Sequence, residues 1–192
     1  MGANDRDDWN SRHRGRDAGG APEPSVIELI PRLRANSLVL DAASGRGRNA
    51  FALARAGHRV IACDYSIEAV RIVAAASRAQ GLAIAPIVAD IEDFPFQPRC
   101  FDAIVNVNFL VRPLFACFAR ALKIGGTLMV DTFLIDQAQY GHPRDPRFLL
   151  ARGELRELMR DFEIETYREG EAFYSDGVSA WRGCAVGRLR KG

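Results

Sequence analysis

The feature that most constrains this chain is a short stretch in which an apolar run is followed by glycines and then by helix-forming residues. It spans residues 38–50 and reads LVLDAASGRGRNA. Gly45, Gly47 and Ala50 match the pattern G-x-G-x-x-A between a predicted strand and a predicted helix. Glycines there allow a tight turn and close approach of a ligand, and the helix N-terminus adds free N–H groups. The stretch therefore predicts a ligand-binding loop after the first strand of an α/β sheet.

Apolar runs of strand length alternate with helical patterns along the rest of the chain. Strands are predicted at 38–40, 60–63, 84–88, 103–107, 127–133, 163–168 and 179–189, and helices at 48–56, 66–80, 113–122 and 154–161. Ser25 and Glu28 form a capping box that predicts one more helix, Gly125 and Gly126 predict a turn, and residues 175–177 predict a hairpin turn. Apolar strands alternating with helices indicate a parallel sheet covered on both faces. We therefore predict an α/β, Rossmann-like, doubly wound fold, with a mostly parallel seven-stranded sheet and a C-terminal antiparallel hairpin.

The length of 192 residues fits a single domain, which we place at residues 23–192. It follows a polar segment, residues 1–22, whose composition favours disorder. Trp9 argues instead for an ordered segment, because large aromatic residues are rare in purely solvated tails.

Composition excludes several classes of protein. The formal net charge of +2 is too small to indicate a nucleic-acid partner, and no apolar run approaches the 18 residues of a membrane span. The four cysteines lie far apart and include no Cys-x-x-Cys pair, so we predict neither a metal site nor a disulfide framework. The N-terminus lacks the apolar stretch of a secretory signal. A cytoplasmic location follows as the expectation.

Two acidic residues indicate which ligand the glycine loop binds. Asp64 ends the second predicted strand, where a carboxylate can accept both ribose hydroxyl hydrogens of a dinucleotide or of S-adenosylmethionine. Asp41 separates these two ligands, because a carboxylate at the loop would repel a pyrophosphate. The same charge would attract the ammonium and sulfonium groups of S-adenosylmethionine. The sequence therefore favours S-adenosylmethionine as the cofactor.

At these positions the chain resembles the class I S-adenosylmethionine-dependent methyltransferases. Their first motif, D-x-G-x-G-x-G, stands here at residues 41–47, with Ala43 in place of the first glycine. The resemblance implies that Asp64 binds the ribose, that the Tyr65 ring packs on the adenosine, and that the Asp90 side chain and the next N–H meet the adenine. The predicted cofactor-binding residues are Asp41, Ala42, Ala43, Gly45, Gly47, Asp64, Tyr65, Asp90, Ile91 and Asn106.

Within that family, several segments look like the small methyltransferases of the tellurite-resistance type. They include residues 47–50, 112–115, 131–133 and 143–170. Residues 9–13, Trp-Asn-Ser-Arg-His, resemble the N-terminal W-D-x-R-Y element of that group, with His13 in place of the tyrosine. The element folds over the cofactor, so the resemblance makes a cofactor lid the alternative to disorder for residues 1–22.

Candidates for binding the methyl acceptor follow the fourth and fifth predicted strands, where ligands bind in such sheets. Asn106 and Asn108 are placed to line the space beside the methyl group, although backbone bonding of such asparagines is an equally good interpretation. Arg112 is a candidate for holding an anionic acceptor, with a solvated side chain as the alternative. Tyr140 and His142 are candidates for closing over the substrate, although His142 before a proline is more often a turn residue. No catalytic residue is identified.

We therefore predict an S-adenosylmethionine-dependent methyltransferase that acts by in-line transfer on a small molecule, for example a thiol or a chalcogen oxyanion. Such soft nucleophiles need little base catalysis, in keeping with the lack of any catalytic triad pattern in the sequence. A non-catalytic S-adenosylmethionine-binding regulatory or partner protein is the alternative. A small NAD-dependent oxidoreductase is a third possibility, disfavoured by Asp41 and by the lack of a Tyr-x-x-x-Lys pattern. The sequence predicts neither the exact acceptor nor the oligomeric state.

Overall fold

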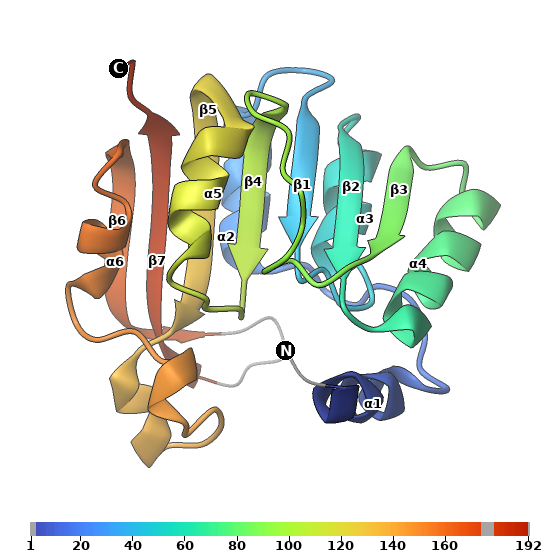
Figure 1. The fold of residues 1–192 in the computed structure, drawn as a ribbon, viewed down its shortest axis with the longest axis horizontal. Helices are drawn as coiled ribbons and strands as arrows, with labels where there is room; N and C mark the ends of the chain where they lie inside the picture. The colour runs from blue at the N-terminus through green and yellow to red at the C-terminus, as the bar shows by residue number, and fades with distance from the viewer. Residues whose placement is uncertain (1–2, 174–178, 192) are drawn as a thin grey trace. The chain divides into compact units, whose positions relative to one another are not determined.

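The structure is a computed structural model that describes residues 3–173 and 179–191. The chain divides into two compact units, Met1–Pro95 and Phe96–Gly192, which are taken in turn below (Figure 1). The hairpin turn predicted at residues 175–177 lies outside the described residues.

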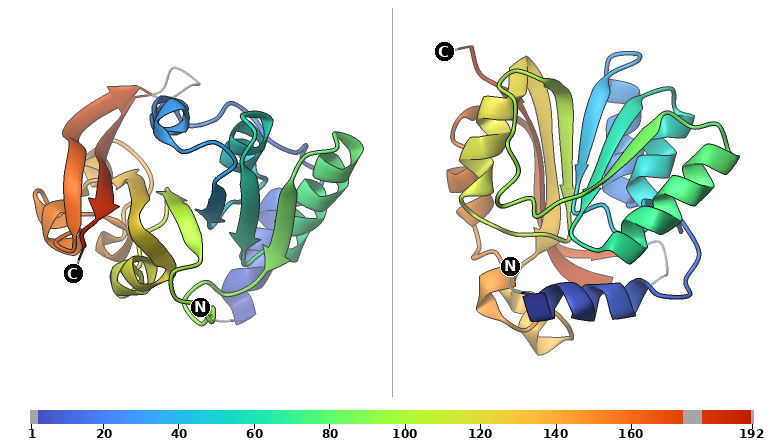
Figure 2. Two further views of the ribbon diagram at one scale, coloured as in Figure 1. Left: turned by 90° about the horizontal axis from the view of Figure 1, so that it is seen from above. Right: turned by 45° about the vertical axis from the view of Figure 1, so that its right-hand side comes forward.

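The first unit contains three parallel strands with helices packed against them. Its elements are α1 (Ala3–His13), α2 (Pro24–Leu29), β1 (Leu38–Ala42), α3 (Arg48–Arg55), β2 (Arg59–Asp64), α4 (Ile67–Ala79) and β3 (Ile84–Val88), with a 3₁₀ turn at Ile30–Arg32. Strand β2 pairs in parallel with both β1 and β3. Figure 2 shows α3 and α4 on the same face of these strands. Because the strands run in parallel, the segments that follow β1, β2 and β3 emerge at one edge, where the predicted cofactor residues lie.

Local signals explain where the helices of this unit begin and end. Ser66 caps α4 as predicted, because its hydroxyl accepts a hydrogen bond from the Ala69 N–H. The predicted capping box at Ser25 is wrong, because Glu23 is the N-cap of α2 and Ser25 lies buried inside the helix. Pro24 accounts for the difference, since its fixed φ suits the first helical position and so places the cap at Glu23, two residues before Ser25.

The second unit contains four strands. Its elements are β4 (Phe101–Val107), α5 (Leu114–Ala121), β5 (Leu122–Phe133), α6 (Glu154–Leu158), β6 (Phe162–Phe173) and β7 (Ser179–Leu189), with 3₁₀ turns at Ile135–Gln139 and Pro146–Phe148. Strands β4 and β5 are parallel, whereas β7 is antiparallel to both β5 and β6. The predicted C-terminal antiparallel hairpin is thereby confirmed, with β7 as the strand between β5 and β6. The ends of β4 and β5 carry the predicted acceptor residues.

Some boundaries in this unit differ from prediction. Pro113 is the N-cap of α5 rather than its first residue, and α6 ends at Leu158 because the chain soon enters β6 with the buried Phe162. The turn predicted at Gly125 and Gly126 is a bulge near the start of β5, where the pairing jumps from Phe101↔Leu122 to Ala103↔Thr127. A Cβ on Gly126 would lie 2.8 Å from a backbone oxygen, which explains the glycine there.

The seven strands have the order β3-β2-β1-β4-β5-β7-β6. This mostly parallel order with one antiparallel strand confirms the predicted Rossmann-like, doubly wound α/β fold class. The largest fully buried side chains include Leu40 and Leu53 in the first unit, and Ile104, Leu128 and Met129 in the second. Among the described residues, no helix is long and apolar enough to cross a membrane.

Candidate functional site

The glycine loop between β1 and α3 has a conformation that its glycines make possible. Gly45 and Gly47 have φ of 53° and 80°, in the region that favours glycine. A Cβ on Gly47 would lie 2.9 Å from the Val73 side chain and 3.1 Å from that of Phe51, so a larger residue would displace α3 or α4. Ala43 also has a positive φ, of 53°, at the position where the family motif has its first glycine. The loop therefore holds a glycine-type backbone even where the residue is alanine.

The carboxylate of Asp64, at the end of β2, is bonded to the glycine loop. Its Oδ2 accepts a hydrogen bond of 2.7 Å from the Gly45 N–H, and its Oδ1 accepts one of 2.9 Å from the Ser66 N–H. Each carboxylate oxygen retains capacity for a further hydrogen bond. The structure thus brings Asp64 and Gly45 together, in an orientation fixed by two backbone donors.

Asp41, at the end of β1, is only 1% exposed. Burial raises the pKa of Asp41 to about 7, although the Ala50 N–H and the Arg48 charge act in the opposite direction. Its Oδ2 has no hydrogen-bond partner among the described residues. A buried carboxylate oxygen without a partner is costly, and an ammonium group would satisfy it. This orphaned oxygen therefore fits the charge of the amino-acid end of S-adenosylmethionine.

The residues predicted to meet the adenosine lie after β2 and β3. The Tyr65 ring is half-buried, and the Arg6 guanidinium lies 4.2 Å from its centroid. Asp90 Oδ1 accepts a hydrogen bond of 3.1 Å from the Glu92 N–H, and Ile91 is buried. The position of Arg6 was not predicted, because nothing in a polar N-terminal segment indicates which ring its arginines cover.

The two asparagines at the end of β4 differ in burial. Asn106 is 1% exposed; its Nδ2 donates to the Phe109 carbonyl oxygen at 3.1 Å, and its Oδ1 has no partner among the described residues. Asn108 is exposed, adopts φ of 57°, and donates its N–H to the Asp131 carbonyl oxygen at 2.9 Å. Backbone bonding therefore occurs at both, and Asn106 keeps one acceptor that a ligand would satisfy.

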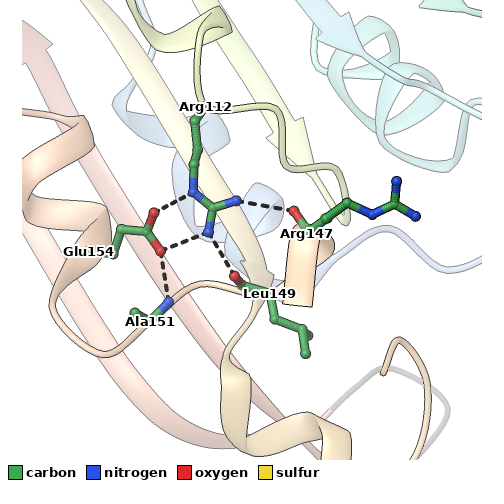
Figure 3. Close-up of polar contacts among 5 residues, drawn as sticks. All are labelled: Arg112, Arg147, Leu149, Ala151 and Glu154. Carbon is green, nitrogen blue, oxygen red and sulfur yellow. Dashed lines mark hydrogen bonds and ion pairs between the residues drawn. The ribbon is translucent and has the colours of Figure 1, made fainter. Parts of the chain in front are cut away.

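Arg112 is bound within the protein (Figure 3). Its guanidinium donates to both carboxylate oxygens of Glu154, and also to the carbonyl oxygens of Arg147 and Leu149 at 3.1 and 3.0 Å. Glu154 Oε2 also accepts the Ala151 N–H, and the ion pair raises the pKa of Arg112 and lowers that of Glu154. The arrangement ties the start of α5 to the segment that leads into α6. It makes Arg112 a positioning residue for that segment.

Tyr140 and His142 lie together in the loop that follows β5. Tyr140 is 68% exposed, and its ring stacks on that of Trp181, with the centroids 6.0 Å apart. His142 is exposed, and its carbonyl oxygen accepts a hydrogen bond from Gln137 Nε2. Gln137 is buried and its Oε1 accepts the Trp181 N–H at 2.9 Å. Sequence reasoning missed Gln137, because a single glutamine carries no pattern.

A buried ion pair at the end of β5 was also missed. Arg182 Nε donates to Asp131 Oδ1 at 2.5 Å, its Nη2 donates to the Asp131 carbonyl oxygen, and the two side chains are only 4% and 7% exposed. The guanidinium also lies 4.8 Å from the centroid of the Phe133 ring. The signal that would have found the pair is an arginine in an apolar strand predicted to neighbour a strand containing an aspartate.

Comparison with known proteins extends this description. Residues 39–126 match the family model described as a methyltransferase domain. The chain is 37% identical over 106 residues to demethylmenaquinone methyltransferase of Thermobifida fusca, covering 50% of this chain and 43% of the relative. It is 30% identical over 158 residues to malonyl-[acyl-carrier protein] O-methyltransferase of Herminiimonas arsenicoxydans, covering 79% of this chain and 52% of the relative. The chain therefore spans about half the length of these curated relatives.

A solved structure shows the same fold. TehB from Haemophilus influenzae superposes with a TM-score of 0.74 at 21% identity, covering 86% of this chain and 61% of TehB. The match of residues 39–126 includes the glycine loop, Asp64 and Asp90, whose geometry is described above. The matches to methyltransferases support S-adenosylmethionine as the cofactor. Residues 39–126 of the chain are therefore similar to a methyltransferase domain, and the chain has the fold of TehB.

Proposed function

We propose that this protein transfers the methyl group of S-adenosylmethionine to a small-molecule acceptor. One observation carries the proposal: the 2.7 Å hydrogen bond from the Gly45 N–H to Asp64 joins the glycine loop to the second-strand acid. The orphaned, buried oxygen of Asp41 supports it, because it supplies negative charge without a protein partner. A dinucleotide would instead bring a pyrophosphate close to that carboxylate, where charge repulsion opposes binding.

The proposed roles in the first unit follow from these groups. Asp41 holds the ammonium group, Asp64 accepts hydrogen bonds from the ribose, and the Tyr65 ring packs on the adenosine. Asp90 and the Ile91 N–H bind the adenine. The backbone at Ala42 and Ala43 lies beside the methionine part of the cofactor. Asn106 Oδ1 is proposed as a further acceptor for the ligand, because it is buried without a partner among the described residues.

The cofactor supplies a methyl carbon already activated by the sulfonium. The protein then has to orient the acceptor in line with that carbon and exclude water. No general base is proposed, because a thiolate or a chalcogen oxyanion attacks without losing a proton in the same step. We therefore propose acceptors of this soft, anionic class.

The segments after β4 and β5 are proposed to carry the acceptor contacts, with Asn108 after β4 and with Tyr140 and His142 after β5. All three are exposed, and the backbone of each makes a hydrogen bond, while the Tyr140 ring also stacks on that of Trp181. Arg112 is proposed to act indirectly, by fixing the segment of residues 147–154. The two curated relatives are named for different acceptors, so their names do not select one for this chain. A cytoplasmic site of action is proposed as well, in line with the four free cysteines.

A thermal-shift measurement with S-adenosylhomocysteine, NAD and ATP tests the proposed cofactor. We expect only S-adenosylhomocysteine to raise the melting temperature of the wild type. The shift should disappear in Asp64→Ala and persist in Asp93→Ala, a matched control at an exposed aspartate. A shift with NAD and none with S-adenosylhomocysteine would contradict the proposal.

Transfer of labelled methyl groups tests the activity. Dithiothreitol, selenite and tellurite are the probes, and we expect volatile or extractable label with at least one of them. Binding of S-adenosylhomocysteine without transfer to any of these probes would overturn the proposed acceptor class. If no acceptor in a broader panel of small molecules is labelled either, the non-catalytic binding protein becomes the better description.

A further inference from the structure

His13, the last residue of α1, lies over the glycine loop. Its Cε1 is 3.8 Å from the position that a Cβ on Gly45 would occupy, which is ordinary van der Waals distance. Gly45 is also the residue whose N–H is bonded to Asp64. His13 therefore stands beside the two groups on which the proposed function rests.

Contacts on both sides of His13 hold this segment in place. Asn10 Oδ1 accepts the hydroxyl hydrogen of Ser66, two residues after Asp64, at 2.8 Å. Beyond His13, Arg46 of the glycine loop donates to the Asp17 carbonyl oxygen at 2.6 Å and accepts the Gly19 N–H at 2.8 Å. The segment is thus attached to both loops that meet at Gly45 and Asp64.

The His13 ring itself is packed but incompletely bonded. Trp9 stacks on it with an angle of 18° between the rings, and its Nδ1 is buried without a partner among the described residues. Burial lowers the pKa of His13, so the neutral ring is favoured. In a neutral ring that carries its proton on Nε2, Nδ1 is a hydrogen-bond acceptor.

The charges around His13 also favour the neutral ring. Arg12 and Arg16 come from its own segment and Arg46 from the glycine loop, and all three oppose protonation. Asp64, at the end of β2, is the group that acts in the other direction. A protonated ring would add a positive charge to this cluster and to a ligand that is itself cationic.

We propose that His13 is a cofactor-contacting residue, which accepts a hydrogen bond from the ribose of bound S-adenosylmethionine through Nδ1. The inference rests on the proposed function, because it places the ribose at Asp64. It adds a contact from outside the sheet and from a side chain that titrates. Protonation of His13 removes the acceptor, so cofactor affinity decreases as the ring becomes charged.

Isothermal titration of the full chain with S-adenosylhomocysteine at pH 7.5 tests the contact. His13→Phe keeps the ring that stacks on Trp9 but has no acceptor, and we expect it to bind about tenfold more weakly. His13→Asn places an oxygen close to the position of Nδ1 and should bind within about threefold of the wild type. Arg14→Ala, at an exposed neighbour, should bind like the wild type. Equal binding by His13→Phe and the wild type would overturn the inference.

The same titrations at pH 5.5 test the role of protonation. Asp41 also titrates in this range, so cofactor affinity is expected to change with pH even without His13. The change in the wild type is therefore compared with the change in His13→Asn. We expect the affinity of the wild type to decrease at least fivefold more than that of His13→Asn. Equal decreases in affinity in the two proteins would show that protonation of His13 does not weaken cofactor binding.

These outcomes separate the inference from the proposed function. A wild type that fails to bind S-adenosylhomocysteine at pH 7.5, or an Asp64→Ala variant that binds normally, would contradict the proposed function. Normal loss of binding in Asp64→Ala together with an unaffected His13→Phe would contradict only the role of His13. Far-ultraviolet circular dichroism of each variant confirms that it is folded, and His13→Asn tests protonation independently of His13→Phe.

Discussion

The two units of the chain treat their buried polar groups differently. In the unit of β1–β3, Asp41 Oδ2 and His13 Nδ1 are buried without partners among the described residues. In the unit of β4–β7, the buried charges of Asp131 and Arg182 pair with each other, and the neutral Asn106 Oδ1 is buried without a partner among the described residues. Buried polar groups without partners are costly, so each needs an explanation, and a bound ligand is one of them. We infer that the first unit keeps a buried carboxylate for a cationic ligand, whereas the second unit pairs its buried opposite charges and keeps a neutral acceptor, Asn106 Oδ1.

Breaking the Asp131–Arg182 pair should give the largest effect on stability. Arg182→Met leaves the carboxylate of Asp131 buried without its cation, and we expect a loss of about 3–5 kcal/mol in the free energy of unfolding, measured with urea. Replacing both residues, as in Asp131→Leu with Arg182→Met, should recover most of that loss.

Arg188→Met is the matched control in the same strand, because its pair with Glu165 is 38% and 26% exposed. It should cost less than about 1 kcal/mol. If Arg182→Met proved as mild as this control, the buried pair would not be what holds the end of β5.

Asp41→Asn, in the first unit, should raise the free energy of unfolding rather than lower it. The pKa of Asp41 is raised from 3.8 to about 7 on folding, so the folded wild type loses stability as the pH rises between these two values. The variant should escape this loss and be more stable at pH 8 by about 1–3 kcal/mol without cofactor. We also expect its affinity for S-adenosylhomocysteine to fall at least tenfold.

Melting temperatures from pH 5 to pH 8, with and without S-adenosylhomocysteine, check this prediction. Asp93→Asn, at an exposed aspartate, is the control that should leave the profile unchanged. A variant that is less stable than the wild type at pH 8 would mean that the charge of Asp41 supports folding rather than ligand binding.

Glu154→Gln should have a smaller effect, confined to the second unit. The Arg112 guanidinium lowers the pKa of Glu154 below 4.5, so the pair stabilises the fold above that pH and is lost as the pH falls through the lowered value. Because the Arg112 side chain is 39% exposed, we expect only about 1 kcal/mol from urea unfolding at pH 7. Glu157→Gln, on the same helix, should have no effect. A strong loss of S-adenosylhomocysteine binding in Glu154→Gln would contradict the proposal that the Arg112–Glu154 pair positions a segment of the second unit and does not act in cofactor binding.

Ala43→Gly should have the smallest effect and should be favourable. An alanine with φ of 53° carries strain that glycine relieves, partly offset by the greater freedom of glycine in the unfolded chain. The net gain should be about 0.5 kcal/mol in thermal or urea unfolding. Ala42→Gly, in the buried end of β1, should instead destabilise the protein.

The sheet was predictable from the sequence because its strands are nearly continuous apolar runs. The bounds 84–88 and 179–189 match β3 and β7. As expected, Ser66 caps the start of α4 and Gly57 follows the end of α3. Boundaries without such local signals were less predictable. The sequence predicts a cap at Ser25 because a capping box and a proline-started helix look alike in sequence, and only the packed backbone distinguishes them.

The candidate site was predictable where chemistry and spacing coincide. Asp64 and Gly45 lie together because the first and second strands are parallel and end at the same edge of the sheet, while their predicted roles in binding the cofactor stay predictions. Arg112 was less predictable, because its partners Glu154 and Leu149 lie about 40 residues away and no local pattern links them. Asn10 was missed for the same reason, since its contact with Ser66 spans 56 residues.

The placement of tryptophan has a spectroscopic consequence. The chain has two tryptophans, and each lies in a different unit: Trp9 stacks on His13, and Trp181 stacks on Tyr140. Each unit of the protein therefore carries one tryptophan as an intrinsic fluorophore. In Trp181→Phe, emission would come from the indole ring beside the glycine loop alone. In Trp9→Phe, it would come from the ring beneath Tyr140, so the two halves can be observed separately without any attached label.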